Sequence, residues 1–527
     1  MEPWTPEERA ALAPYFTDLD GPVFALVNLP EVVKGALFAR YSRSPKSLRR
    51  LFLDEFREPL SADPGGATVG TRRAEQLFDR VFGEYGDDSV AQLGGVHLAC
   101  EGASNVLTKV LEWGRLMAYL EQSTRYIAYT DRPGGRFRYH VPAELEGHPL
   151  RARYVETLDG AFETYARLIE PLTRHWATRV PREPGVGDGA YRAAVRARAL
   201  DSLRGLLPAA TRSSVGIFGT GQAYEALLLR MRAHPLREVQ DYAALMLVEL
   251  RKVIPAFLTR VDRPDRGIAG SRYLAETRAA TRATAERLLA GLDPEPRPEV
   301  ALTDWDPEGE VKVVAAALYA VSDLPDDQLL AVAQKLSDDE RRAVLAAYVG
   351  RRQNRRHKPG RAFERTTYRF DVLGDYGAFR DLQRHRLCTI EWQALSPRHG
   401  YAVADEIGEA GAAADWEGVM AASADLHGRL AEAGLGDVAS YAVSMAYRVR
   451  FYMEMNAREA MHLIELRTTP QGHPAYRRIG QAMHRLIAEQ AGHKALAAAM
   501  VHADHSGGEG GRLLAEHKSA ERRGGAS

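Results

Sequence analysis

Apolar residues recur at intervals of three and four along most of this chain, a pattern that predicts amphipathic helices. The clearest example is QAYEALLLRMRAHPLREVQDYAALMLVELRKVI, residues 222–254. Strand signals are few. PVFALVNL from residue 22 and EVKVVAAALYAV from residue 310 carry β-branched residues near their start, and we predict a strand in each. The pattern therefore predicts a helix-rich protein with little strand.

A stretch with weak periodicity separates two helix-rich regions. Residues 261–309 concentrate proline, glycine and acidic residues around one candidate helix, SRYLAETRAATRATAERLLAGL, and we predict a linker there. The chain then divides into a first domain over residues 20–260, this linker, and a second domain over residues 310–504. Residues 505–527 are rich in glycine and poor in apolar residues, so we expect a disordered tail.

Composition narrows the class of protein. At 527 residues the chain is long enough for two cores, and 45% apolar with 27% charged residues is typical of a soluble protein. The 70 basic and 70 acidic side chains cancel, which argues against a dedicated nucleic-acid or membrane binder. Cys100 and Cys388 form no disulfide or metal pattern, and the 16 histidines show no metal-ligand spacing, so we expect no metal. The acidic N-terminus is unlike a signal peptide, and we expect a cytoplasmic protein.

An internal comparison indicates a repeat. LLLRMRAHPLREVQDYA in the first half and LIELRTTPQGHPAYRRIGQAM in the second share an apolar run, arginine near its end, His-Pro and an amphipathic continuation. We interpret this as a tandem duplication that has diverged.

Arg384, His385 and Arg386 are adjacent, so they cannot share one face of a helix or strand. Such a cluster either lies in solvent or surrounds an anion. The preceding RRQNRRHKPGR could contact nucleic acid, but it lacks interleaved aromatic residues, and we expect no nucleic-acid partner.

The triplet resembles the arginine-histidine-arginine signature of the flavin-dependent thymidylate synthases, where a Glu-Gln-Ser-x-Arg-Tyr segment follows it. Here the signature is divided between the halves. The second half keeps the triplet and continues LCTIEWQALSPRHGY, whereas the first half reads Trp113-Gly114-Arg115 at that place and keeps EQSTRY from Glu121 to Tyr126.

Other elements of the family divide in the same way. Glu364 in RAFERTTYRF resembles a flavin-contacting glutamate, and NAREAMHLIELR, residues 456–467, resembles an FAD-binding helix that ends in Leu-Arg. RGLLP, which begins at Arg204, resembles a segment that supplies a nucleotide-binding arginine. On a helix Arg458 and His462 share a face, and Arg467 lies about half a turn away, where it can serve another ligand.

The resemblance implies two tandem copies of an α+β fold and a reaction that converts dUMP to dTMP with FAD as cofactor and methylenetetrahydrofolate and NADPH as co-substrates. It also implies composite sites, which the family builds across subunits, and we expect a homodimer that mimics a family tetramer. The implied catalytic residues, at the junction of nucleotide and flavin, are Arg384 and Arg467. The implied cofactor-binding residues are Glu364, Arg384, His385, Arg386, Asn456, Arg458, His462 and Leu466. The implied dUMP-binding residues are Glu121, Gln122, Ser123, Thr124, Arg125, Arg204 and Arg467.

Two departures from the family pattern leave alternatives open. Asp381 replaces a glutamine three residues before the triplet, and Ala394 replaces a serine after it. A negative charge beside a phosphate or uracil weakens binding or alters substrate choice. The alternatives are a related flavin-dependent enzyme that acts on another pyrimidine nucleotide, and a non-catalytic protein that binds flavin or nucleotide.

Overall fold

The computed structural model describes residues 4–22, 24–41, 44–56, 92–124, 127–182 and 187–506, and the chain divides into two compact units. The first unit comprises Met1–Ala103, Gly114–Gln122 and Ser214–Leu292, and the second comprises Ser104–Trp113, Ser123–Ser213 and Asp293–Ser527. Segments of the first half of the sequence therefore contribute to both units. A tail is predicted over residues 505–527, and its residues from 507 onward lie outside the described residues.

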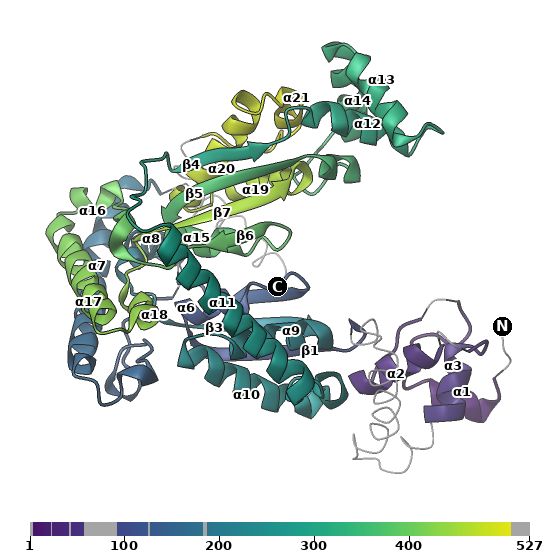
Figure 1. Ribbon diagram of the computed structural model, residues 1–527, viewed down its shortest axis with the longest axis horizontal. Helices are drawn as coiled ribbons and strands as arrows, with labels where there is room; N and C mark the ends of the chain where they lie inside the picture. Colours follow the sequence, from purple (N-terminus) through teal and green to yellow (C-terminus); the bar gives the residue numbers. More distant parts are fainter. Residues whose placement is uncertain are drawn as a thin grey trace. The chain divides into compact units, whose positions relative to one another are not determined.

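The first unit contains a three-stranded sheet in the order β1-β3-β2 (Figure 1). β2 pairs antiparallel with β3, and Thr220 caps the helix that follows β3 with its side chain. The strands are β1 (Gly95–Ser104), β2 (Met117–Glu121) and β3 (Arg212–Thr220). The helices are α1 (Pro6–Leu12), α2 (Glu31–Tyr41), α3 (Leu48–Leu51), α9 (Gly221–Arg232), α10 (Arg237–Val253) and α11 (Ala269–Leu288), with short turns η1 (Phe52–Phe56), η6 (Pro255–Leu258) and η7 (Pro264–Ile268).

The second unit contains a four-stranded antiparallel sheet in the order β4-β5-β7-β6, with α19 and α20 lying against it (Figure 1). Alternate residues of β5 and β7 are buried, as a sheet covered on one face requires. The strands are β4 (Val300–Trp305), β5 (Thr367–Asp375), β6 (Thr389–Trp392) and β7 (Arg448–Asn456). The longer helices are α6 (Asn105–Leu111), α7 (Leu150–Arg179), α8 (Asp188–Leu203), α12 (Gly309–Tyr319), α13 (Asp326–Lys335), α14 (Asp338–Val349), α15 (Tyr376–Gln383), α17 (Ala413–Glu432), α19 (Ala457–Arg467) and α20 (Pro474–Glu489). The shorter ones are α16 (Asp405–Glu409), α18 (Gly436–Ala439), α21 (Lys494–Ala498), η3 (Pro133–Gly135), η4 (Ala143–Leu145), η5 (Arg204–Leu206), η8 (Arg361–Arg365), η9 (Pro397–His399) and η10 (Ser440–Ala442).

The two halves of the chain repeat one order of elements, which supports the predicted duplication. β1, α6, β2, η5, β3 and α9 in the first half correspond to β5, α15, β6, η10, β7 and α19 in the second. The strand order is also the same. In the first sheet β3 lies between β1 and β2, and in the second sheet β7 lies between β5 and β6. The helix-rich α+β prediction is therefore confirmed.

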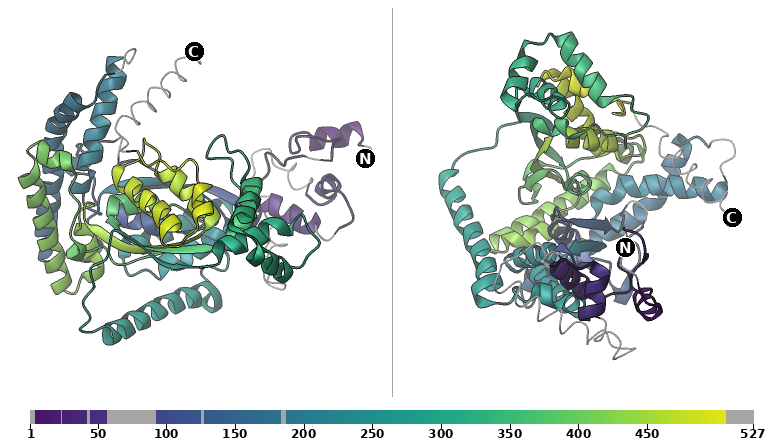
Figure 2. Two further views of the ribbon diagram at one scale, coloured as in Figure 1. Left: turned by 90° about the horizontal axis from the view of Figure 1, so that it is seen from above. Right: turned by 90° about the vertical axis from the view of Figure 1, so that its right-hand side faces the viewer.

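Equivalent elements of the two halves meet inside the second unit. α7 and α17 run side by side (Figure 2), joined by two hydrogen bonds of 2.8 Å from Arg167 to Asp415. The loops that follow η5 and η10 pair with each other through reciprocal backbone bonds. The Ala209 N–H donates to the Val443 carbonyl at 2.8 Å, and the Met445 N–H donates to the Leu207 carbonyl at 2.9 Å. This reciprocal pairing resembles an isologous contact between identical subunits.

The helix predictions agree with the structure better than the strand predictions do. The stretch 222–254 forms α9 and α10, with a break at His234-Pro235. The strand predicted from residue 310 is wrong, because these residues form α12, where Val313, Val314 and Ala317 are buried at helical spacing and alanine favours the helix. The strand predicted from residue 22 is also wrong. Residue 23 lies outside the described residues, only Leu26 forms an isolated bridge, to Phe16, and Asn28 has a left-handed φ of 54°.

The predicted linker contains its predicted helix, α11, and also β4, which pairs with β5 at the edge of the second sheet. Among the described helices, none combines the length and apolar character needed to cross a bilayer.

Candidate functional site

Three arginines surround the carboxylate of Asp381 on α15. The Arg384 Nη2 atom lies 2.5 Å from Oδ1, the Arg204 Nη1 atom lies 3.7 Å from Oδ2, and the Arg467 Nη1 atom lies 3.8 Å from Oδ1. Arg467 also donates to the Asp381 carbonyl. Asp381 is shared by all three guanidinium groups, and their forked donors can also bind a further anion.

Arg204 reaches this cluster from the first half of the chain. It lies in η5, directly before the loop that pairs with the equivalent second-half loop, and its side chain is buried. Helix α6 adds a second attachment, because the Tyr376 hydroxyl donates to the Asn105 carbonyl at 2.9 Å and the Gln383 side chain donates to the Lys109 carbonyl at 2.8 Å. The structure therefore brings together Arg204, Arg384 and Arg467, which the sequence predicted to act at one site.

His385 is held between two charged groups. Its Nε2 atom accepts a hydrogen bond of 2.9 Å from the Arg467 Nε–H, and its Nδ1 atom lies 3.2 Å from Glu459 Oε1. Since arginine only donates, the imidazole proton is on Nδ1 and points to Glu459. Burial, reinforced by the charge of Arg467, holds the pKa of His385 well below its ordinary value. A neutral His385 thus orients the Arg467 guanidinium.

His385, Glu459 and His462 place one potential metal-ligand atom each within 4.8 Å of one another. The sequence spacing gave no sign of this cluster, because His385 comes from a different element than the other two residues. Burial raises the pKa of Glu459 to about 7, and Lys358 and Arg458 oppose that rise. Burial lowers the pKa of His462 to about 4, and the charges of Lys358 and Arg355 lower it further. This concentration of positive charge repels a divalent cation and favours an anion.

The remaining predicted cofactor residues lie around the start of α19. The Asn456 side chain caps α19 by accepting from the Glu459 N–H at 2.9 Å, which leaves its amide nitrogen as a donor. Arg458 donates to the Pro359 carbonyl at 2.9 Å and lies 3.7 Å from Glu364, which also pairs with Arg361. Two further predicted residues differ in exposure: Arg386 is exposed, and Leu466 on α19 is half-buried.

The predicted first-half segment divides between the units. Glu121 and Gln122 belong to the first unit, Ser123 and Thr124 belong to the second, and Arg125 lies outside the described residues. Thr124 is buried, and its hydroxyl accepts a hydrogen bond of 3.5 Å from Arg380 Nη1. Arg380 lies one helical turn before Arg384, so this contact attaches Thr124 to the helix that carries Asp381.

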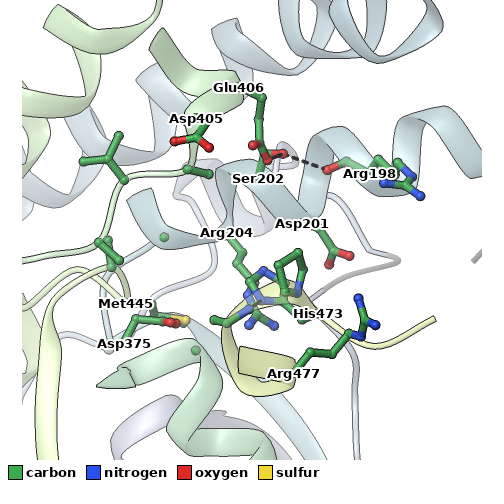
Figure 3. Close-up of a pocket in the computed structure, with 18 of the residues that line it drawn as sticks. Arg198, Asp201, Ser202, Arg204, Asp375, Asp405, Glu406, Met445, His473 and Arg477 are labelled. Atoms are coloured by element: carbon green, nitrogen blue, oxygen red, sulfur yellow. Dashed lines mark hydrogen bonds between the residues drawn. The ribbon is translucent and has the colours of Figure 1, made fainter. Parts of the chain in front are cut away.

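A cavity of about 560 Å³ opens beside Arg204 (Figure 3). Its size is within the range of small-molecule sites. Arg198, Arg477 and Arg478 line it with Arg204, together with acidic groups that include Asp375. The Arg204 Nη2 atom is buried and has no hydrogen-bond partner among the described residues, and burial raises the pKa of Asp375 although Arg204 opposes the rise. A buried donor without an acceptor is costly, which is consistent with a ligand or water here.

The equivalent place in the other half is filled. Trp113 follows the first residue of α6 at the same interval as Arg384 follows the first residue of α15. Trp392 ends β6 as Glu121 ends β2. The two indoles meet edge to face with centroids 6.1 Å apart. An aromatic contact therefore stands where the family's motifs have an arginine and a glutamate.

Sequence reasoning missed the roles of Arg380, Asp375 and Glu459. Both Arg380 on α15 and Asp375 precede the triplet in the sequence, and Asp375 is the N-cap of α15, a role that its place before the helix could have indicated. Glu459 precedes His462 by one turn, a spacing that could have indicated a shared face.

Comparison with known proteins places the chain in a family. The family described as thymidylate synthase complementing protein matches residues 36–256 and 301–491, in two separate segments. The chain therefore belongs to this family and holds two copies of its domain. A protein of Chlamydia muridarum (strain MoPn / Nigg), named UPF0159 protein, is 36% identical over 519 residues, covering 97% of this chain and 98% of its own length. UPF0159 protein Ta1429 of Thermoplasma acidophilum is 31% identical, covering 93% of this chain and 99% of its own length.

More distant relatives carry functional names. A flavin-dependent thymidylate synthase of Clostridium tetani is 24% identical over 200 residues, covering 37% of this chain and 74% of its own length. A solved structure of a UMP/dUMP methylase from Streptomyces cacaoi aligns with 38% of this chain and 94% of its own, at 19% identity and a TM-score of 0.30, and carries no argument at that level.

Proposed function

We propose that this protein is an FAD-dependent thymidylate synthase that converts dUMP, methylenetetrahydrofolate, NADPH and a proton to dTMP, tetrahydrofolate and NADP⁺. Membership of the family supports the reaction class. The observation that carries the proposal is the cluster of Arg204, Arg384 and Arg467 around Asp381, beside a cavity. A nucleotide phosphate or an anionic pyrimidine edge matches the forked donors of these arginines.

The residues around α19 fit FAD in their chemistry. Arg458 supplies a cation, Asn456 keeps an amide donor, and a neutral His462 can donate or accept. When bound, the flavin would supply the redox chemistry that no side chain provides. The protein's own contribution is positioning. His385 fixes the Arg467 guanidinium through its Nε2 atom, and Glu459 fixes the tautomer of His385.

Two measurements on the purified protein test this function. The first is the flavin absorption spectrum with and without dUMP, which reports flavin binding and stacking of the pyrimidine on the flavin. The second is release of tritium from C5 of labelled dUMP in the presence of methylenetetrahydrofolate and NADPH. Bound flavin and bound dUMP with no tritium release would instead support a non-catalytic binding protein. A protein that binds neither ligand would contradict the proposal.

Asp381 favours a second candidate, an enzyme of the same type that acts on a different pyrimidine nucleotide. A carboxylate accepts from the exocyclic amino group of cytosine, whereas the carbonyl at the same place in uracil repels it. The same spectral titration with dCMP and UMP in place of dUMP compares the candidates directly. A larger response to dCMP than to dUMP would favour the second candidate.

The predicted homodimer is retained as part of the proposal. The contacts of Arg204 with Asp381 close within one chain, so a dimer is not required for them. Light scattering that gives a dimer would support the mimicry of a family tetramer, and full activity in a monomer would reject it. The cytoplasmic location stays a prediction from the sequence.

A further inference from the structure

The loop between α14 and η8 carries the basic run Arg351–Lys358, and its position is fixed by a buried ion pair. Arg352 donates to both Glu465 carboxylate oxygens at 2.6 Å, and also to the Ala499 carbonyl at 2.9 Å. The side chains of Arg352 and Glu465 are 2% and 1% exposed. Glu465 belongs to α19, so the loop is attached to the helix that carries Arg458 and His462. A run of basic residues that simply lies in solvent would not contain a buried ion pair of this kind.

The other end of the loop is attached near the start of the same helix. The Arg458 Nε–H donates to the Pro359 carbonyl, directly after Lys358. The charges of Lys358 and Arg355 lower the pKa of His462. Partial desolvation lowers the pKa of Lys358 itself, and Arg458 and Arg355 add to that effect although Glu459 opposes it. The loop therefore presents cations to the α19 face that bears Arg458 and His462.

Arg355, Arg356 and Lys358 form no ion pair within the part of the chain that the structure describes. The acidic groups whose charge acts on Lys358 are the buried Glu459 and Glu465, and burial raises the pKa of Glu459 to about 7. Placing uncompensated cations side by side is unfavourable unless an anion joins them. A metal ion held by His385, Glu459 and His462 would add positive charge to this surface and increase the repulsion.

We propose that Arg355 and Lys358, together with Arg458, bind the diphosphate of a flavin dinucleotide. The inference rests on the proposed function, and it adds loop residues outside the motifs that resemble the flavin-dependent family. A diphosphate carries about two negative charges and an array of acceptor oxygens, which matches guanidinium and ammonium donors. The loop is thus a built part of the cofactor site.

Titration of the full-length protein with FAD and with riboflavin, followed by flavin fluorescence, tests the proposal. Riboflavin carries the same ring system and no phosphate. The double variant Arg355→Ala/Lys358→Ala is expected to bind FAD about tenfold to a hundredfold more weakly. It should bind riboflavin as the parent does, and its FAD affinity should depend less steeply on salt. The matched control is Lys335→Ala, which removes an exposed cation from α13 in the same unit and should change none of these values.

Unchanged FAD affinity and salt dependence in the double variant would overturn the inference while leaving the proposed function intact. Equal losses of FAD and riboflavin binding would show a structural role for the loop and would also overturn it. Loss of binding to a single-stranded oligonucleotide, with FAD affinity retained, would assign the loop to nucleic acid instead. A parent protein that binds no FAD would reject the proposed function and this inference together.

Discussion

Arg204 from the first half of the chain and Asp381 from the second form an ion pair, with Arg204 Nη1 3.7 Å from Asp381 Oδ2 and both side chains largely removed from solvent. The loop after Arg204 pairs with the equivalent loop of the second half, and this pairing places the guanidinium at α15. A duplicated chain can therefore join motifs that each half retains alone. At the place where the second half has Arg384, the first half has Trp113, which contacts Trp392.

Replacing Asp381 with asparagine should tighten dUMP binding by about tenfold, corresponding to about 1.4 kcal/mol. The reason is that its carboxylate competes with the nucleotide for Arg204, Arg384 and Arg467. The same change should lower the melting temperature, because the arginines then repel one another without a counter-ion. Asp371→Asn on β5, which removes a 2.9 Å pair with Arg450 on β7, is the control for loss of an ion pair. Weaker dUMP binding in Asp381→Asn would show that the carboxylate contacts the ligand favourably.

Replacing Arg458 with alanine should weaken FAD binding by about ten- to a hundredfold, since a charge-assisted hydrogen bond contributes roughly 1.5–3 kcal/mol. Gln222 lies at the equivalent place in the first half, where it bonds Gln92, and Gln222→Ala should leave FAD affinity unchanged. Equilibrium dialysis of FAD against both variants measures the difference. Equal losses would mean that the division of roles between the halves is wrong.

Glu459 should make stability depend on pH. Its folded pKa of about 7 lies above its ordinary value of 4.5, so folding favours the protonated carboxyl. Its contribution to stability is complete below about pH 4.5 and is lost as the pH rises through about 7. Glu459→Gln keeps an acceptor for His385 and cannot ionise. The melting temperature of Glu459→Gln relative to the parent should therefore rise between about pH 5 and about pH 8. The corresponding change in the free energy of unfolding is at most on the order of 3 kcal/mol.

The contribution of His462 has the opposite sign. Its folded pKa of about 4 lies below its ordinary 6.5, so its contribution is present above about pH 6.5 and is lost as the pH falls through about 4. Because His462 is present in both proteins, its effect largely cancels in the comparison. A difference in melting temperature that stays constant with pH would contradict the prediction for Glu459.

Trp113 and Arg384 occupy equivalent places and should give opposite results. Trp113→Ala should reduce stability by about 1–2 kcal/mol through lost packing, and leave FAD and dUMP affinity unchanged. Arg384→Ala should weaken dUMP binding by about tenfold or more, because it removes a cation from the cluster. Calorimetry and ligand titration on the two variants separate the effects. Loss of nucleotide affinity in Trp113→Ala would mean that the tryptophan pair belongs to a working site.

The sequence singled out Arg204, Arg384 and Arg467 because each belongs to a short local pattern, and the structure brings the three side chains together around Asp381. The sequence could not predict their distances, which depend on backbone pairing between loops that lie far apart in the chain. It also missed the contact of His385 with Glu459, because these residues are 74 positions apart in the chain and come together only through the tertiary fold. The strand prediction from residue 310 failed because burial at helical spacing and alanine content outweighed β-branched residues there.

In the proposed composite site, residues of the first half bind the nucleotide, and residues of the second half bind the flavin. The dUMP-induced change in the flavin absorption spectrum tests it most directly, in the variants Arg204→Gln and Arg204→Lys and in Arg125→Ala. Arg204→Gln and Arg125→Ala should keep FAD and lose the response to dUMP, since each removes a cation proposed to bind the nucleotide and leaves the residues proposed to bind FAD in place. Arg204→Lys should recover part of the response, and an unchanged melting temperature in Arg125→Ala would exclude general damage. Retained FAD with a parent-like dUMP response in both Arg204→Gln and Arg125→Ala would contradict the account, because the first half would then contribute nothing to nucleotide binding.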